Sequence, residues 1–139
     1  MTILEVSKAT GLPVKTIRYY EEVGLITPKR RANGYREFSD RDRRDLSFLA
    51  HARGLGFSLE HCRALLALRA SPARASADVK AIAEMHLAEI DGRIAALEAM
   101  RATLQELTAA CAGDQGAACG ILEGIEAAGL GKNAPASEA

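Results

Sequence analysis

Tryptophan is absent from these 139 residues, and aromatic residues of all kinds make up only 4% of them. Long apolar runs are missing as well, because charged residues interrupt every hydrophobic stretch, whereas a membrane-spanning helix needs about 20 consecutive apolar residues. The sequence does not open with the basic segment and apolar core of a secretory signal. With 48% hydrophobic residues, the composition predicts a small, mainly helical protein of the cytoplasm that makes no contact with a membrane.

Cysteine is scarce, with three residues: Cys62, Cys111 and Cys119. Because the cytoplasm keeps thiols reduced, we interpret them as packing, redox or metal-binding groups rather than as structural disulfides. Catalytic patterns are missing too: no nucleophile with its base, phosphate-binding loop or pair of catalytic carboxylates is evident. The sequence therefore indicates a protein other than an enzyme.

Charge is distributed unevenly, although the whole chain is neutral. Residues 1–70 contain 13 Lys and Arg against 8 Asp and Glu, a net charge of +5. Residues 71–139 contain 5 against 10, a net charge of −5. The basic half is the candidate face for nucleic acid, although a surplus of this size is equally typical of a solvated surface.

The N-terminal segment has the pattern of two short helices joined by a tight turn. Apolar spacing predicts a helix over residues 3–10 that ends at Gly11, where glycine permits a left-handed turn. Pro13 begins a second helix, which Gly24 ends. Four side chains of the second helix are basic or aromatic: Lys15, Arg18, Tyr19 and Tyr20. This is the layout of a helix-turn-helix with its recognition helix, and an ordinary helical hairpin is the alternative.

A β-hairpin is predicted next, because an Asn33-Gly34 turn separates a basic arm from an arm of alternating polarity within residues 28–38. A basic hairpin beside a helix-turn-helix is typical of a wing that reaches the phosphate backbone. We therefore predict a winged helix-turn-helix DNA-binding domain over residues 1–70. Its basic wing residues are Lys29, Arg30, Arg31 and Arg36.

Two further helices complete this domain. One is capped by Ser39 or Asp40 and runs to about residue 53, and the other is capped by Ser58 and ends near residue 70. The residues of the first that we expect to face inward are Leu46, Leu49 and Ala50. His61 and Cys62 point about 100° apart on the second, so we assign Cys62 to the core and His61 to the surface.

A long helix is predicted over residues 76–110, because apolar side chains recur alternately four and three positions apart in the manner of a coiled coil. At 1.5 Å per residue it reaches roughly 50 Å, too long for this chain to cover. We expect a second copy of the chain along it, with a helix buried within one chain as the alternative. The stripe consists of Ala83, Leu87, Ile90, Ile94, Leu97 and Leu104, and its seam shifts near Arg101 to Met100 and Leu107.

Two thiols bracket the glycine-containing loop that follows. Seven residues separate Cys111 from Cys119, and glycines let the loop curl so that both sulfurs can reach one ion. A redox pair and two unrelated packing positions are the alternatives. We predict a metal-binding loop with a short apolar helix over residues 111–128 and a disordered tail over residues 129–139.

Four segments carry a family resemblance: Thr16-Ile17-Arg18-Tyr19-Tyr20-Glu21, Gly24-Leu25-Ile26, Asn33-Gly34-Tyr35-Arg36 and Gly56-Phe57. In combination they resemble the MerR family of transcription regulators. Residues 76–80 and the cysteine loop are similar to the copper-efflux (CueR-like) subgroup. The resemblance implies a homodimer joined by an antiparallel coiled coil. It also implies an activator that binds double-stranded promoter DNA and distorts it so that RNA polymerase can use an overlong spacer.

The resemblance also implies a metal, because divalent-metal members of the family have a cysteine where Ser76 stands here. Two thiolates, Cys111 and Cys119, satisfy a monovalent soft ion such as Cu(I), Ag(I) or Au(I), whereas Zn(II) normally takes four ligands. We assign His86 to the dimer surface rather than to the site. A thiol redox sensor, a sensor of a divalent ion (Zn, Cd, Hg or Pb) and a DNA-binding scaffold without a regulatory role remain as alternatives.

Two further residues are expected around the metal. Ser76 fits the N-cap of the long helix, and the positive end of that helix, or Lys80 one turn later, can offset the negative charge of a bis-thiolate site. The tail departs from some copper members, because residues 129–133 replace a terminal Cys/His cluster. A second metal site is therefore in doubt.

The family's DNA contacts carry over to six positions of this sequence. Arg18 is the best candidate to reach a base edge, since its planar fork can pair with guanine, and most of the others should touch phosphate. The six residues are Lys15, Arg18, Tyr20, Tyr35, Arg36 and Arg53.

Overall fold

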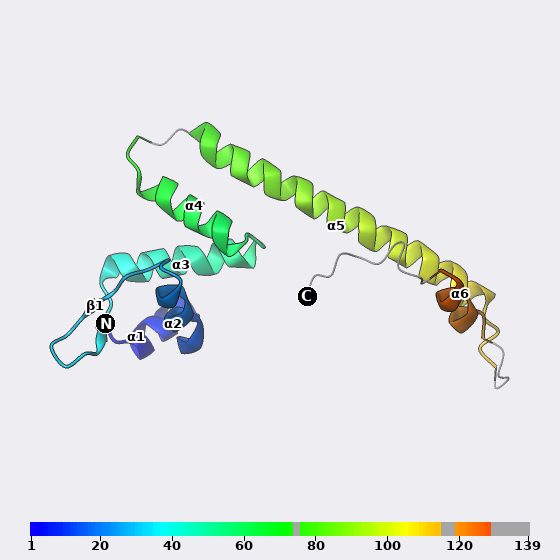
Figure 1. The fold of residues 1–139 in the computed structure, drawn as a ribbon, viewed down its shortest axis with the longest axis horizontal. Coiled ribbons are helices and arrows are strands. Elements are labelled where there is room, and N and C mark those ends of the chain that lie inside the picture. Colours follow the sequence, from blue (N-terminus) through cyan, green and yellow to red (C-terminus); the bar gives the residue numbers. More distant parts are fainter. Residues whose placement is uncertain (74–75, 115–118, 129–139) are drawn as a thin grey trace. The chain divides into compact units, whose positions relative to one another are not determined.

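The computed structural model describes residues 1–73, 76–114 and 119–128 (Figure 1). It is mainly helical and divides into two units, Met1–Glu84 and Met85–Ala139. The elements are α1 (Ile3–Thr10), α2 (Val14–Glu22), β1 (Lys29–Arg30), β2 (Arg36–Glu37), α3 (Asp40–Gly54), α4 (Leu59–Ala70), α5 (Ser76–Ala110) and α6 (Gly120–Ala128). This order confirms the predicted winged helix-turn-helix followed by a long and a short helix. The predicted domain boundaries stay a prediction.

Local sequence signals explain how the first two helices begin and end. Thr2 and Glu5 form a reciprocal capping box at the start of α1, which satisfies two backbone donors that the helix leaves unpaired. Gly11 ends α1 with φ at 76°, a left-handed conformation that suits glycine. Pro13 stands just before α2 as its N-cap rather than as its first residue, one position earlier than its predicted place.

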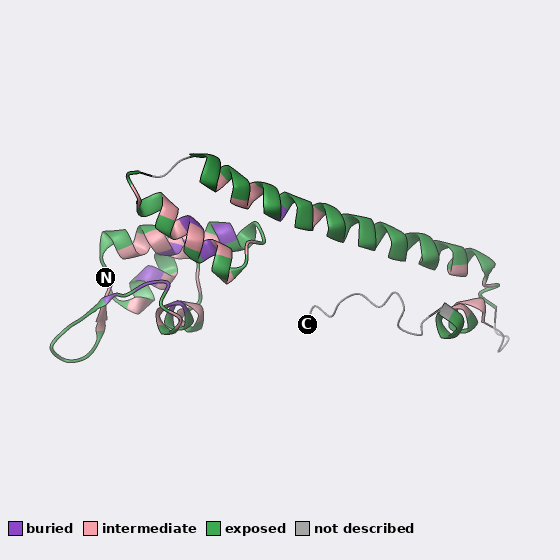
Figure 2. Ribbon diagram, turned by 45° about the horizontal axis from the view of Figure 1, so that its top comes forward, coloured by how far each residue is buried: buried purple, intermediate pink, exposed green. Residues whose placement is uncertain are grey.

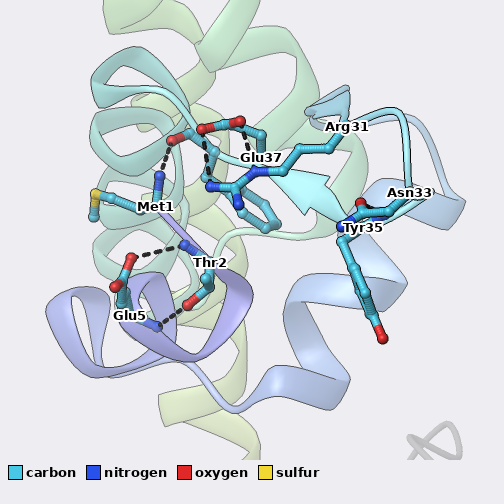
Figure 3. A network of polar contacts seen from close by, with 8 residues as sticks. Met1, Thr2, Glu5, Arg31, Asn33, Tyr35 and Glu37 are labelled. Atoms are coloured by element: carbon cyan, nitrogen blue, oxygen red, sulfur yellow. Dashed lines mark hydrogen bonds and ion pairs between the residues drawn. The ribbon is translucent and has the colours of Figure 1, made fainter.

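The wing is a two-stranded antiparallel hairpin in which Lys29 pairs with Glu37 and Arg30 with Arg36. At its tip, Asn33 Oδ1 accepts a hydrogen bond of 3.1 Å from the backbone N–H of Tyr35, and Gly34 adopts φ of 85°. Arg31 forms an ion pair of 2.8 Å with Glu37 across the strands (Figure 3). This pair lowers the pKa of Glu37, first by hydrogen bonding and then by charge attraction.

A single hydrophobic core joins α1, α2, the wing and the next two helices. The fully buried side chains are Phe38, Ile17, Leu46, Leu49, Val6 and Cys62. The inward positions predicted for α3 are right at Leu46 and Leu49, but Ala50 is half-buried and Ala52 is buried instead. Ala52 follows Leu49 by three positions and so shares its face of the helix.

Backbone hydrogen bonds also join the N-terminal residue to the segment that follows the wing. The amino group of Met1 donates a hydrogen bond of 2.9 Å to the carbonyl of Phe38, and the N–H of Phe38 donates one of 2.9 Å to the carbonyl of Met1 (Figure 3). This reciprocal pair fixes the exit of the wing against the start of α1. Buried Phe38 is therefore held by both its ring and its backbone.

The helix α5 is almost entirely exposed (Figure 2). The predicted stripe includes Leu87, Ile94, Leu97 and Leu104, whose exposed fractions run from 47% to 62%. Exposed apolar side chains at coiled-coil spacing leave a continuous face uncovered, as expected of a helix that binds a second helix. Only 6% of His86 is exposed in the single chain, and its assignment to the dimer surface stays a prediction.

Within the described residues, none of the helices combines the length and the apolar character that crossing a membrane requires. The tail that we predicted to be disordered, residues 129–139, lies outside the described residues.

Candidate DNA-binding face and metal centre

The recognition helix α2 is amphipathic. Ile17 and Tyr20 face the core, with exposed fractions of 0% and 4%, while Lys15, Arg18 and Tyr19 are exposed. Lys15 and Arg18 are thus exposed to solvent, and their contact with DNA stays a prediction. Tyr20 packs against the core behind the helix and offers little surface for the DNA contact that we predict for it. Exposed Tyr19, its neighbour, has the accessible ring.

The wing contains two candidate DNA contacts, of which one is exposed and the other is bonded to a side chain of α2. Tyr35 is 72% exposed at the tip of the hairpin. Arg36 is half-buried, and its Nε donates a hydrogen bond to Oε1 of Glu21 on α2. Glu21 also forms an ion pair of 3.3 Å with Nη2 of Arg30. One carboxylate therefore ties both strands of the wing to the recognition helix.

Two arginines near α3 and α4 brace the same domain. Exposed Arg53, a predicted DNA contact, donates a hydrogen bond of 2.7 Å from Nη1 to the carbonyl of Phe57. Arg63 of α4 donates from Nη2 to the carbonyl of Val23, at 2.6 Å, and from Nη1 to that of Gly24, at 3.3 Å. These two carbonyls follow α2, so Arg63 secures the end of the recognition helix by supplying donors to backbone groups that the helix leaves unpaired.

Sequence reasoning missed the roles of Glu21 and Arg63. An acidic residue inside an otherwise basic DNA-binding segment was the available signal for Glu21. Arg63 offered no comparable signal, because its partners lie about forty positions earlier in the chain.

The two thiols that bracket the predicted metal loop lie close together. Cys111 directly follows α5 and Cys119 directly precedes α6, and their sulfurs are 3.8 Å apart. Both residues are half-buried and free of disulfide bonds. Between them, Gly113 adopts φ of 69°, which helps the chain to reverse after α5. Residues 115–118 lie outside the described residues.

One residue of α6, Gly124, lies close to the side chain of Leu107 near the end of α5. A Cβ atom placed on Gly124 would lie 2.1 Å from Cδ2 of Leu107, so only a residue without a side chain fits there unless Leu107 moves. At the start of α6, a Cβ atom on Gly120 would lie 3.7 Å from the carbonyl oxygen of Ala110. The approach is therefore tight only at Gly124, because a Cβ atom at Gly120 would make an ordinary van der Waals contact.

Electrostatics distinguish the thiols from one another. Hydrogen bonding to the backbone N–H of Leu122 lowers the pKa of the Cys119 thiol, and Ile121 and Cys111 act in the same direction. The carboxylate of Glu123 opposes them. Burial raises the pKa of the Cys62 thiol. The Cys119 thiol therefore loses its proton more readily than an ordinary cysteine, and the Cys62 thiol less readily; the thiolate is the form that binds metals.

The paired thiols fit a single soft metal ion. Metal–sulfur bonds of about 2.3 Å place two sulfurs of one ion no more than ~4.6 Å apart, and the observed 3.8 Å meets that limit. Among the described residues, no group of three or more His, Cys, Asp or Glu side chains is arranged to hold a metal. There the candidate donor set consists of the two thiols alone.

Ser76 and Lys80, which we expected around the metal, lie within the first two turns of α5, whereas Cys111 follows its last residue. A helix of 35 residues separates its two ends by roughly 50 Å, so one chain does not bring these residues to its own thiols. Ser76 is the first residue of α5, and the position before it lies outside the described residues.

Comparison with known proteins shows which family has this combination of a DNA-binding domain and a long helix. A model of the MerR HTH family regulatory proteins matches residues 1–68, and a model described as MerR, DNA binding, matches residues 43–107. The chain is 53% identical to the HTH-type transcriptional regulator HmrR of Rhizobium leguminosarum bv. viciae, over 88% of its own length and 95% of that protein's. The chain belongs to the MerR family. A MerR-family chain is a DNA-binding transcription regulator, which confirms that this protein is not an enzyme.

Two more MerR-family proteins are similar over nearly the whole chain. The regulator CueR of Yersinia pestis is 47% identical over 90% of this chain and 91% of its own. The crystal structure of the transcription regulator PbrR691 from Ralstonia metallidurans CH34, in complex with lead(II), superposes with a TM-score of 0.79 at 30% identity. That superposition covers 90% of this chain and 98% of the other. The MerR similarity thus extends beyond the DNA-binding domain to the segment that contains both cysteines.

Proposed function

We propose that this MerR-family chain is a metal-responsive transcription activator that binds promoter DNA as a homodimer and senses Cu(I), or Ag(I) or Au(I), through Cys111 and Cys119. The observation that carries this proposal is the distance of 3.8 Å between the two free sulfurs at the junction of α5 and α6. The names of its relatives support a metal signal, since one is CueR and another was crystallised with lead(II).

The choice of a monovalent ion rests on the number of donors. Two thiolates complete the coordination of Cu(I) in a near-linear arrangement, for which the two sulfurs would move from 3.8 Å to about 4.6 Å apart, whereas Zn(II) normally takes four ligands from Cys, His or carboxylate. Ser76 occupies the position at which a third thiolate would stand in a sensor of divalent ions. When bound, the metal supplies a link between the end of α5 and the start of α6.

Protein groups around the thiols have separate roles in this proposal. Cys119 lies just before α6, where backbone N–H groups favour a thiolate and offset the negative charge of a bis-thiolate site. In an antiparallel dimer, the start of one α5 lies beside the end of the other. Ser76 and Lys80 of one protomer would then reach the thiols of its partner, where they could offset the negative charge of the bis-thiolate site.

Dimerisation is proposed along α5, whose apolar stripe is exposed in the single chain. Each protomer would then present its own recognition helix and wing, with Lys15, Arg18, Tyr35, Arg36 and Arg53 as the DNA contacts. Ordering of the cysteine loop and α6 would shift α5 and, with it, the attached DNA-binding domains. The resulting distortion of the promoter for RNA polymerase is indirect readout of DNA shape.

Anaerobic titration of the reduced protein with buffered Cu(I) and, separately, Zn(II) tests this proposal. We expect tight Cu(I) binding that both Cys111→Ser and Cys119→Ser abolish, and weak Zn(II) binding. Cys62→Ala is the matched control, because it removes the buried thiol and should leave Cu(I) binding intact. Zn(II) binding as tight as that of Cu(I), or Cu(I) binding that survives both serine substitutions, would contradict the proposal.

A thiol redox switch is the second candidate, since sulfurs 3.8 Å apart can also form a disulfide with little movement. Mild peroxide followed by thiol alkylation and mass spectrometry separates the two functions. A redox sensor would show a Cys111–Cys119 linkage together with loss of promoter activation. A metal sensor would activate with both thiols reduced.

A further inference from the structure

Glu21 stands out on the DNA-binding face because it is an acidic residue with two arginine partners. Its side chain is only 19% exposed, and its two oxygens divide between the strands of the wing: Oε1 accepts from Arg36 and Oε2 from Arg30. These two arginines are directly opposite each other in the hairpin. A single carboxylate in the last turn of α2 therefore holds the wing at a paired position of its two strands.

The two arginines differ in which of their guanidinium nitrogens are hydrogen-bonded. Arg30 uses both terminal nitrogens, because Nη2 contacts Glu21 and Nη1 donates to the carbonyl of Gly34 at 2.9 Å. Arg36 is held at Nε, and within the described residues its Nη1 and Nη2 atoms make no hydrogen bond. Glu21 thus engages the inner edge of the Arg36 guanidinium and leaves its terminal donors available to another acceptor.

We propose that Glu21 is a specificity-determining positioning residue of the DNA interface, which aims Arg36 and keeps the wing in register with the recognition helix. The proposal rests on the proposed DNA contact of Arg36 and goes beyond it, because Glu21 acts on DNA only through the arginines. Phosphate contacts position a protein on DNA and base contacts specify sequence. A wing fixed to α2 therefore gives the base-reading side chains of that helix one defined approach.

The charge of Glu21 predicts how its loss changes the affinity for unselected DNA. Near DNA an acidic residue repels phosphate, so Glu21 weakens general attraction while it improves geometry. Without the carboxylate, Arg30 and Arg36 can contact phosphates on any duplex. Because each added phosphate contact steepens the dependence of log K on log salt by about one, loss of Glu21 should strengthen binding to unselected DNA and increase its salt dependence.

The test compares Glu21→Gln with Glu22→Gln. Glu22 is the neighbouring residue; it is exposed and has no ion pair or side-chain hydrogen bond within the described residues, so its substitution makes the same change of charge without releasing an arginine. The probes are duplexes selected by the wild-type protein from a randomised pool and unselected duplexes of equal length. Affinity for each is measured across a series of salt concentrations.

We expect Glu21→Gln to lower the ratio of selected to unselected affinity roughly tenfold and to steepen the salt slope on unselected DNA by about one to two, one for each released arginine that contacts a phosphate. Glu22→Gln should leave the ratio unchanged. Equal ratios for both variants and the wild type would overturn the inference. Failure of the wild type to select any duplex would instead contradict the proposed function.

A second variant separates positioning from folding. If Glu21→Gln lowers the thermal midpoint, the same measurement is made on Arg36→Gln and on the double variant at a temperature where all are folded. Positioning through Arg36 predicts that Glu21→Gln changes the ratio much less when Arg36 is already replaced. Independent, additive effects of the two substitutions would overturn the inference.

Discussion

Gly124 lies directly against Leu107, so closely that a methyl group at Gly124 would stand 2.1 Å from Cδ2 of that leucine. Leu107 belongs to the last turns of α5 and Gly124 to the middle of α6. Their contact holds the two helices together immediately beside the junction that carries both thiols. We therefore expect a large side chain at position 124, five positions beyond Cys119, to change the separation of the two sulfurs.

We predict that Gly124→Leu weakens Cu(I) binding about ten- to hundredfold, because overpacking of a tight contact costs about 1–3 kcal/mol and here separates α6 from α5. Ala127→Leu is the matched control, since Ala127 is exposed on the same helix. Both variants are titrated with Cu(I) in competition with a chelator. If Gly124→Leu and Ala127→Leu bind Cu(I) equally well, the contact does not set the thiol geometry.

Phe38 gives a prediction for the stability of the DNA-binding domain. Its ring is 2% exposed at the centre of the core, so Phe38→Ala should lower the free energy of unfolding by about 3–5 kcal/mol. The control is Leu4→Ala, at a position 65% exposed, which should change stability by no more than about 0.5 kcal/mol. Urea denaturation followed by circular dichroism measures both. A small loss for Phe38→Ala would show that the core is organised differently.

The pH dependence of stability should reveal the buried Cys62. Its pKa is raised in the folded protein by burial, so above the unfolded value of about 8.5 the unfolded chain loses the thiol proton while the folded chain keeps it. Stability of the wild type should therefore fall relative to that of Cys62→Ala as pH rises from 8 through the folded pKa. Thermal midpoints across this range measure the difference. A constant difference would mean that the thiol titrates equally in both states.

Helix limits were predictable wherever one residue determines them locally. Gly11 ends α1 and Ser58 caps α4 as predicted, and Ser39 caps α3, one of the two residues predicted for that place, because each acts on backbone groups within a few positions. The hairpin followed from Asn33-Gly34 for the same reason. The long helix followed from its periodic stripe.

Contacts between segments that are distant in the sequence were harder to predict. Glu21 meets Arg36 only because α2 and the wing pack in one particular orientation, and the burial of Tyr20 depends on the same packing. The two cysteines stood out in the sequence because they bracket a glycine-containing loop. The contact between Gly124 and Leu107 could not be predicted, because the sequence does not show which side chain lies against a glycine in a helix. Sequence patterns thus indicated the candidate functional residues more readily than the residues that fix their positions.

The central claim is that two thiolates of this chain, and no third protein donor, bind a monovalent ion. X-ray absorption at the copper edge of the reduced, Cu(I)-loaded protein tests it most directly, because the spectrum reports the number and type of donor atoms. Our account predicts two sulfur neighbours per copper and the loss of that signal in Cys111→Ser and Cys119→Ser. Three or more donors, or a nitrogen or oxygen neighbour in the wild type, would contradict it.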